Sequence, residues 1–237
     1  MRRIDMKIGI IHATCNAVPP LNAVFKKLAP DVTVLNFVDE NIQYYANQIS
    51  GIDDKTHRDF FNITNTAQES GVNVIIVACT VLTPIVESIK PFVKVPILAV
   101  DYPMLEKAIK NYYKIGIVAT NAPTAPATKN QLEKLAKELG KKIEIDTQVD
   151  TQAMTELKAG NETEHNRLNR LAAEKLKKRG CDVIILAQIT QASAEKEVAS
   201  LGLPVLTSPN EAVKTVLNII QEQKSKEVKI LQYTSND

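Results

Sequence analysis

The sequence predicts an α/β fold of two pseudo-symmetric Rossmann-like domains, each with a parallel sheet. Three pairs of similar segments follow one another in the same order, about 107 to 109 positions apart, which is typical of an internal duplication. In both halves, apolar runs of strand length alternate with segments of helical period, as in βα units. The pairs are Lys7–Ile11 with Lys114–Val118, Val74–Thr80 with Val183–Ile189, and Val95–Leu98 with Leu203–Leu206.

The first half is expected to hold four strands, because four short runs are rich in β-branched and other apolar residues. These runs are Lys7–Ile11, Val32–Asn36, Val74–Ala78 and Ile97–Val100. The segments between and after them have helical period and predict helices. The predicted helices are Pro20–Leu28, Arg58–Ser70, Val81–Ser88 and Met104–Asn111.

The second half repeats this plan and then adds a C-terminal helix. Its predicted strands are Ile115–Ala119, Lys142–Thr147, Val183–Ala187 and Val205–Thr207, and its helices are Thr124–Leu139, Asn161–Lys178 and Ala192–Ala199. Ser208 suits an N-cap and Pro209 a first helical position, so a last helix is expected from Pro209 to Glu222. The polar tail beyond it is expected to fray, with Val228–Leu231 as a candidate edge strand.

We expect residues 1–101 together with 206–237 to form the first domain and residues 102–205 the second. No linker rich in Gly, Pro or Ser separates the halves, so a short hinge is expected near Asp101–Pro103, with a second crossing near Pro204. Two similar halves that face each other would place Cys79 and Gln188 at equivalent positions of a shared cleft. The active site is therefore expected in the cleft between the domains.

The composition bounds the class of protein. The chain has 237 residues, and its 29 basic and 27 acidic residues are interleaved and leave a net charge of +2, which gives no reason to expect nucleic acid. No apolar stretch approaches the roughly 18 residues that cross a bilayer, so no membrane partner is expected. The three cysteines are widely separated and predict neither a disulfide framework nor a metal site. We expect a reduced, cytoplasmic protein without metal or cofactor.

Ligands of open parallel sheets bind beyond the carboxyl ends of the strands. Four loops should lie there: His12–Asn16, Cys79–Thr83, Thr120–Thr124 and Gln188–Gln191. All four are rich in short polar side chains, which suit a carboxylate or another small anion. No phosphate-binding Gly-rich motif occurs. The candidate substrate-binding residues are Thr14, Cys15, Thr80, Thr120, Asn121, Thr124 and Thr190.

Cys79 and Gln188 differ in what their side chains can do. A thiol at the end of a strand and the start of a helix can have a lowered pKa and act as an acid or base; the alternative is a small buried cysteine without chemistry. Gln188 has no titratable proton, but its amide can stabilise a carboxylate or an enediolate. The alternative for Gln188 is a helix cap.

Two residues of the first loop are candidates for a second proton carrier. His12 is a competent acid or base near neutral pH, or it caps the following backbone. Cys15 can carry a proton in the same loop, or it is a bystander. The other two histidines, His57 and His165, are expected to be exposed at the starts of polar helices.

Val74–Thr80, its counterpart Val183–Ile189 and the Lys-Ile-Gly-Ile strand openings resemble the aspartate/glutamate/hydantoin racemase superfamily. The resemblance extends to about Ile220. It implies two pseudo-symmetric α/β domains, with one cysteine from each acting on opposite faces of a carbon beside a carboxylate. Cys79 matches the first cysteine, and Thr80 matches a neighbour that commonly binds the substrate carboxylate. Where the family has a second cysteine, this chain has Gln188.

The resemblance implies a cofactor-independent racemase or isomerase of a small carboxylic or amino acid, with Cys79 as acid and base. An alternative is a one-base decarboxylase or lyase in which Gln188 stabilises an enediolate. A second alternative is a non-catalytic protein that binds a small anion. Dimerisation is common in the superfamily, and the sequence leaves a homodimer open.

Overall fold

The computed structural model describes residues 6–49 and 51–234, and the chain divides into two compact units. Unit 1 consists of Met1–Val18, Asn22–Ala99 and Ala212–Asp237. Unit 2 consists of Pro19–Leu21 and Val100–Glu211. Among the helices of the described residues, none combines the length and the apolar character needed to cross a membrane.

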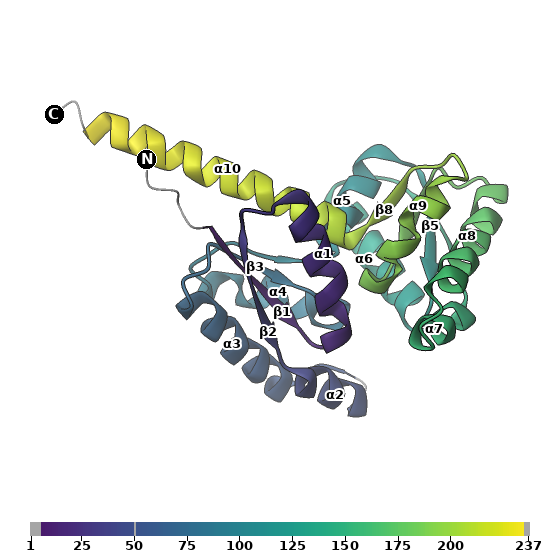
Figure 1. Cartoon of the computed structure of the whole chain (residues 1–237), viewed down its shortest axis with the longest axis horizontal. Coiled ribbons are helices and arrows are strands. Elements are labelled where there is room, and N and C mark those ends of the chain that lie inside the picture. Colours follow the sequence, from purple (N-terminus) through teal and green to yellow (C-terminus); the bar gives the residue numbers. More distant parts are fainter. Residues whose placement is uncertain (1–5, 50, 235–237) are drawn as a thin grey trace. The chain divides into compact units, whose positions relative to one another are not determined.

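Unit 1 is built on a parallel four-stranded sheet with the order β2-β1-β3-β4. Its strands are β1 (Lys7–His12), β2 (Thr33–Val38), β3 (Val74–Val77) and β4 (Ile97–Ala99). Helices connect consecutive strands (Figure 1). They are α1 (Val18–Leu28), α2 (Glu40–Gln48), α3 (Asp54–Glu69) and α4 (Thr83–Ile89), with 3₁₀ turns η1 (Cys15–Ala17), η2 (Thr80–Leu82) and η3 (Lys90–Phe92).

Unit 2 has a second parallel sheet with the corresponding order β6-β5-β7-β8. Its strands are β5 (Lys114–Ala119), β6 (Glu144–Val149), β7 (Val183–Leu186) and β8 (Val205–Thr207). Its helices are α5 (Tyr102–Asn111), α6 (Thr124–Glu138), α7 (Thr151–Lys158), α8 (Glu162–Lys178), the 3₁₀ helix η4 (Ile189–Ala194) and α9 (Glu195–Ala199). Helices α7 and α8 pack side by side (Figure 1). The last helix, α10 (Ser208–Thr234), begins in unit 2 and continues in unit 1.

The strand registers confirm the predicted duplication and the α/β fold class. Ile8 pairs with Val74 in unit 1, and Ile115 pairs with Val183 in unit 2. Cys79 and Gln188 each lie two residues beyond the third strand of their own sheet, and each is the N-cap of a 3₁₀ segment. The two residues are therefore structurally equivalent.

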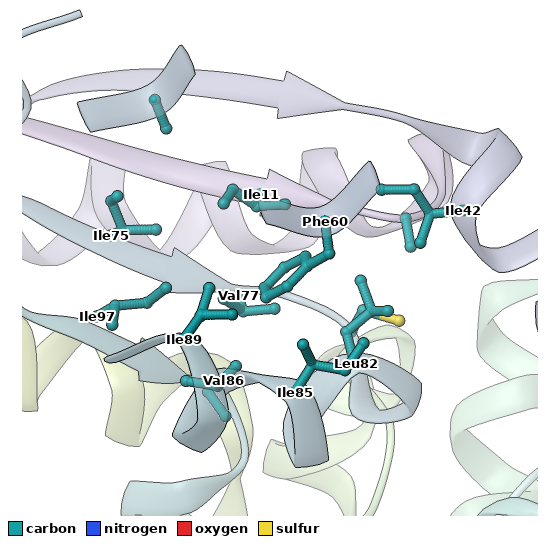
Figure 2. Packing of buried hydrophobic residues seen from close by; sticks show 14 of the residues in the cluster. Ile11, Ile42, Phe60, Ile75, Val77, Leu82, Ile85, Val86, Ile89 and Ile97 are labelled. Carbon is teal, nitrogen blue, oxygen red and sulfur yellow. The ribbon is translucent and has the colours of Figure 1, made fainter. Parts of the chain in front are cut away.

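The apolar strands are buried because helices cover them. Figure 2 shows the ring of Phe60, from α3, among aliphatic side chains that include Ile11 and Val77. Helix α4 adds Ile85 and Val86 to the same cluster. Full burial of a side chain such as that of Phe60 contributes roughly 1.5–3 kcal/mol to the stability of the fold. This packing therefore holds in place the end of β3, which Cys79 follows.

The structure differs from the expected elements at several places. Helices α2 and α7 were not predicted, because both are short and mostly polar and their apolar periodicity is weak. Val228–Leu231 belongs to α10 and not to an edge strand, and α10 continues well beyond Glu222. Ser208 is the first residue of α10 and not its N-cap.

Candidate functional site

In unit 1, Cys79 lies on the face of the sheet that α3 and α4 cover. Its side chain is 7% exposed and packs in the cluster of Ile11, Val77 and Leu82. The backbone of Cys79 is extended and leads into η2. Thr80, the first residue of that turn, is half-buried. A thiol therefore stands where β3 ends, as predicted.

His12, at the end of β1, lies on the opposite face of the same sheet. It follows Ile11, whose side chain shares the cluster of Cys79, and consecutive side chains of a strand point to opposite faces. Its ring is fully buried, and Nε2 lies 2.9 Å from Oδ1 of Asn36. A carbonyl oxygen can only accept, so Nε2 carries the proton. Burial lowers the pKa of His12, although the bond to Asn36 opposes this effect.

Cys15 is exposed at the start of η1, and its surroundings keep its thiol protonated. Its backbone N–H donates to Oε1 of Glu40 at 2.9 Å. Desolvation raises the pKa of the Cys15 thiol, and the carboxylate of Glu40 raises it further. Thr14, the N-cap of η1, accepts a hydrogen bond from Asn16 N–H. Both effects favour the protonated form of the Cys15 thiol.

In unit 2, the structure brings Thr120 and Gln188 together across the ends of β5 and β7. The backbone N–H of Thr120 donates to Oε1 of Gln188 at 2.7 Å, and the Thr120 hydroxyl donates to the same oxygen at 2.8 Å. A backbone N–H can only donate, so the oxygen of the Gln188 amide must face Thr120. The Nε2 group of Gln188 then remains to donate to another acceptor.

Behind Gln188 runs a chain of buried polar side chains. The N–H of Gln188 donates to Oε1 of Gln191 at 2.9 Å, and Nε2 of Gln191 donates to Oδ1 of Asn169 at 2.6 Å. Nδ2 of Asn169 lies 3.2 Å from Nε2 of His165, and Nδ1 of His165 lies 2.7 Å from the carbonyl oxygen of Ala153 in α7. His165 is fully buried, so its predicted exposure was wrong.

The remaining candidates of unit 2 lie near the same strand ends. Asn121 is exposed, and its carbonyl accepts from the N–H of Thr124, the first residue of α6. Thr190 is half-buried in η4.

Several buried polar atoms near the strand ends have no hydrogen-bond partner within the described part of the chain. In unit 1 they include Nδ1 of His12 and Oγ1 of Thr83; in unit 2 they are the hydroxyl oxygens of Thr190, Thr207 and Ser208. Unpaired buried polar groups cost about 1–3 kcal/mol each. Both sets lie at or just beyond the carboxyl ends of strands, where a polar ligand could pair with them.

Sequence reasoning missed Glu40, Gln191, Asn169 and the buried role of His165. The spacing of Gln188 and Gln191 is that of a capping box, which both residues form here, so this pair carried a readable signal. The spacing of His165 and Asn169 places them on one helix face, but nothing in the sequence shows what that face contacts. Among the described residues, no group of three His, Cys, Asp or Glu side chains could hold a metal ion.

Comparison with known proteins gives one family and a set of similar folds. The protein-family model described as "Asp/Glu/Hydantoin racemase" matches residues 8–216. Glutamate racemase isoform RacE1 from Bacillus anthracis is similar with a TM-score of 0.69 and 18% identity, over 92% of this chain and 82% of that one. An aspartate racemase homologue from Pyrococcus horikoshii OT3 has a TM-score of 0.70 and 16% identity, over 90% and 98% of the two chains.

Allantoin racemase from Klebsiella pneumoniae is also similar, with a TM-score of 0.68 and 15% identity over 92% of this chain and 89% of that one. At such identities these likenesses establish the fold. Among curated proteins, no sequence matches the chain.

Proposed function

Since the chain belongs to the Asp/Glu/hydantoin racemase family, we propose that it is a cofactor-independent racemase or isomerase of a small carboxylic or amino acid. It moves a proton at the α-carbon, with Cys79 as acid and base. One observation carries this proposal: equivalent positions of the two sheets hold a thiol, Cys79, and an amide, Gln188, whose oxygen is already occupied. A proton carrier and an anion-stabilising donor are the two functions that carbon-acid chemistry needs.

The proposed reaction proceeds through an enediolate. The thiolate of Cys79 removes the α-proton and becomes a thiol, while the electron pair of the broken C–H bond moves into the carboxylate to form the enediolate. Nε2–H of Gln188 donates to an oxygen of this intermediate, whose added charge needs preorganised donors. A thiol on the opposite face of the carbon then returns a proton, which inverts the centre.

Cys15 is the proposed second proton carrier. Glu40 and desolvation keep its thiol protonated, which is the form that donates a proton. His12 suits this role less well, because its ring is fully buried and its Nε2 is already bonded to Asn36. The glutamate racemase of Francisella tularensis was solved in complex with D-glutamate, which places amino acids first among the substrates to test.

The second candidate is a one-base decarboxylase or lyase. The observation that favours it is Gln188 itself, since an amide cannot exchange a proton with carbon and can stabilise an enediolate. In this reaction the C–C bond to a carboxyl group breaks, carbon dioxide leaves, and the Cys79 thiol protonates the remaining carbanion on one face only. The product then has a single configuration.

Proton NMR in heavy water tests both candidates. Amino, hydroxy, malonic and unsaturated dicarboxylic acids are incubated with wild type, Cys79→Ser, Cys15→Ser and Gln188→Glu. We expect deuterium at the α-position with wild type, and a loss of about 10²-fold or more with Cys79→Ser. Gln188→Glu keeps the acceptor for Thr120 but replaces the donor with a carboxylate, so a loss of about 10²–10³-fold is expected.

The variant Cys15→Ser separates the candidates. A racemase would lose inversion, whereas a one-base enzyme would keep its rate and release carbon dioxide with a product of one handedness. Exchange that survives in Cys79→Ser at the wild-type rate would overturn the role of Cys79. No turnover of any acid, combined with specific binding of one of them, would favour the non-catalytic alternative.

A further inference from the structure

The buried polar chain behind Gln188 has a fixed direction, because a backbone group stands at each end. At one end the N–H of Gln188 can only donate, and at the other the carbonyl of Ala153 can only accept. Gln191 must therefore turn its oxygen toward Gln188 and its NH₂ toward Asn169. Asn169 in turn must direct its oxygen to Gln191 and its NH₂ to His165.

The same constraint decides the state of His165. Its Nδ1 faces the carbonyl oxygen of Ala153 and so carries a proton, while its Nε2 faces the NH₂ group of Asn169 and so offers a lone pair. These two contacts fit the Nδ1–H tautomer of the ring. Asn169 also donates to the carbonyl of His165 at 2.8 Å, which favours the same orientation of the amide in wild type.

Burial makes this chain rigid. Gln191, Asn169 and His165 are each fully buried, and a buried polar group that loses its partner costs about 1–3 kcal/mol. A flip of either amide would place donor against donor at one of its contacts and acceptor against acceptor at the other. The chain therefore has one low-energy arrangement and links η4, α8 and α7 within unit 2.

We propose that Gln191, Asn169 and His165 are positioning residues that hold Gln188 as an obligate hydrogen-bond donor toward an anionic oxygen of the substrate. Gln191 fixes the backbone at position 188, and Thr120 fixes the side-chain oxygen. Within the described part of the protein, these bonds leave the NH₂ of Gln188 to donate to the ligand. This inference rests on the proposed function of Gln188 and extends it to three residues that do not touch the substrate.

The first test measures the protonation of the His165 ring nitrogens and needs no substrate. The sequence has three histidines, so the imidazole ¹⁵N spectrum is simple, and His57→Gln assigns the exposed ring. We expect His165 to show a protonated Nδ1 and an unprotonated Nε2 in wild type. A protonated Nε2 in wild type would overturn the fixed direction of the chain.

Gln191→Glu then tests whether the direction is transmitted. A carboxylate at position 191 still accepts from Gln188, but it can no longer donate to Asn169. The carboxylate can pair with the NH₂ of Asn169 only if this amide gives up its bond to the carbonyl of His165 and turns its oxygen toward the ring, where Nε2 of His165 then takes up a proton. The control is Asn166→Leu, which removes another bond between α8 and η4, from Ser193. We expect a changed His165 spectrum with Gln191→Glu and an unchanged one with Asn166→Leu.

The link to Gln188 is read from the N–H of Thr120, which donates to the amide oxygen of Gln188. In Gln191→Met, the methionine side chain has a size similar to that of glutamine but lacks the amide that donates and accepts hydrogen bonds. We expect hydrogen exchange of the Thr120 amide to accelerate by about 10-fold or more, which corresponds to about 1.4 kcal/mol. Unchanged exchange at Thr120, in a variant that is folded, would overturn the positioning role whatever the enzyme does.

Once a substrate is found, Gln191→Met should lower kcat by about 10²-fold, the cost of a small misplacement, with little change in KM. An equal effect of Asn166→Leu would show general destabilisation and contradict the proposal. If wild type turns over no acid, the proposed function fails. The His165 and Thr120 measurements still test the direction of the polar chain and its effect on Gln188.

Discussion

At the scale of single residues, the three cysteines differ in what surrounds their thiols. Cys15 is exposed and lies beside Glu40, whereas Cys79 and Cys181 are buried. Burial also raises the pKa of Cys181, with Asp146 as a further cause. Only Cys15 combines exposure with a neighbouring carboxylate that can be removed by a conservative substitution.

Glu40→Gln should therefore make Cys15 more reactive. The carboxylate raises the pKa of the thiol, so its removal lowers that pKa and increases the fraction of thiolate, which is the nucleophile. We expect the rate of alkylation by iodoacetamide near pH 8 to rise about two- to fivefold. The measurement is made with Cys79 and Cys181 both replaced by Ser. An unchanged rate would mean that Glu40 does not act on the thiol.

His12 should make stability depend on pH. Burial lowers its pKa below the usual value of 6.5, so the unfolded chain binds a proton more readily than the folded chain. The contribution of neutral His12 to the free energy of unfolding is fully present above pH 6.5. It is lost as the pH falls from that value toward the lower pKa of the folded state. Relative to His12→Gln, wild type should lose free energy of unfolding between about pH 7 and pH 5. Urea titrations at each pH measure this difference, and parallel curves would contradict it.

At the scale of elements, the sequence predicted the sheets better than the helices around them. Val74–Val77 and Val183–Leu186 are fully buried strands, and such apolar runs are visible without any tertiary knowledge. Helices α2 and α7 were missed because their short polar sequences acquire a buried side only through neighbours, as α7 does against α8.

The candidate site was predictable only in part, for a similar reason. Cys79 and Gln188 could be located because they follow recognisable strands, and their equivalence follows from the duplication. The bonds from Thr120 to Gln188 and from Gln191 to Asn169 join segments that are far apart in sequence. No local pattern specifies such pairs, so the chain behind Gln188 required the structure.

The duplicated strands β1 and β5 offer a matched pair of glycines. A Cβ at Gly116 would lie 3.0 Å from Ile184 Cδ1, 3.1 Å from Cys181 Sγ and 3.2 Å from Leu176 Cβ. A Cβ at Gly9 would meet Val72 no closer than 3.3 Å. Gly116→Ala should therefore cost about 1–3 kcal/mol through overpacking, and Gly9→Ala clearly less.

Urea denaturation of the two variants measures these costs. At Gly9 the looser contact with Val72 allows the gain from a less flexible unfolded chain, about 0.4–1 kcal/mol, to offset part of the strain. Equal losses at both positions would show that β5 is no more tightly packed than β1. The comparison is informative because the two glycines hold equivalent positions, each paired with the middle of the adjacent third strand.

At the scale of the whole molecule, the structure contains two similar units with different chemistry at equivalent positions. Unit 1 has a thiol at this position, and unit 2 has an amide whose oxygen accepts from Thr120. The registers of the two sheets correspond, so the difference lies in the residues at the strand ends and not in the architecture. Under the proposed function, both residues act on one substrate molecule in a single transition state.

A double-mutant cycle tests this joint action. Cys79→Ser and Gln188→Glu should each lower the rate of α-deuterium exchange by about 10²-fold or more. If both residues act in the same step, the double variant should lose far less than the product of the two factors, because groups that act as a unit are strongly non-additive. Residues at independent sites would give multiplied losses. The cycle is measured by NMR in heavy water, with circular dichroism to confirm that each variant is folded, and strict multiplication would contradict a shared transition state.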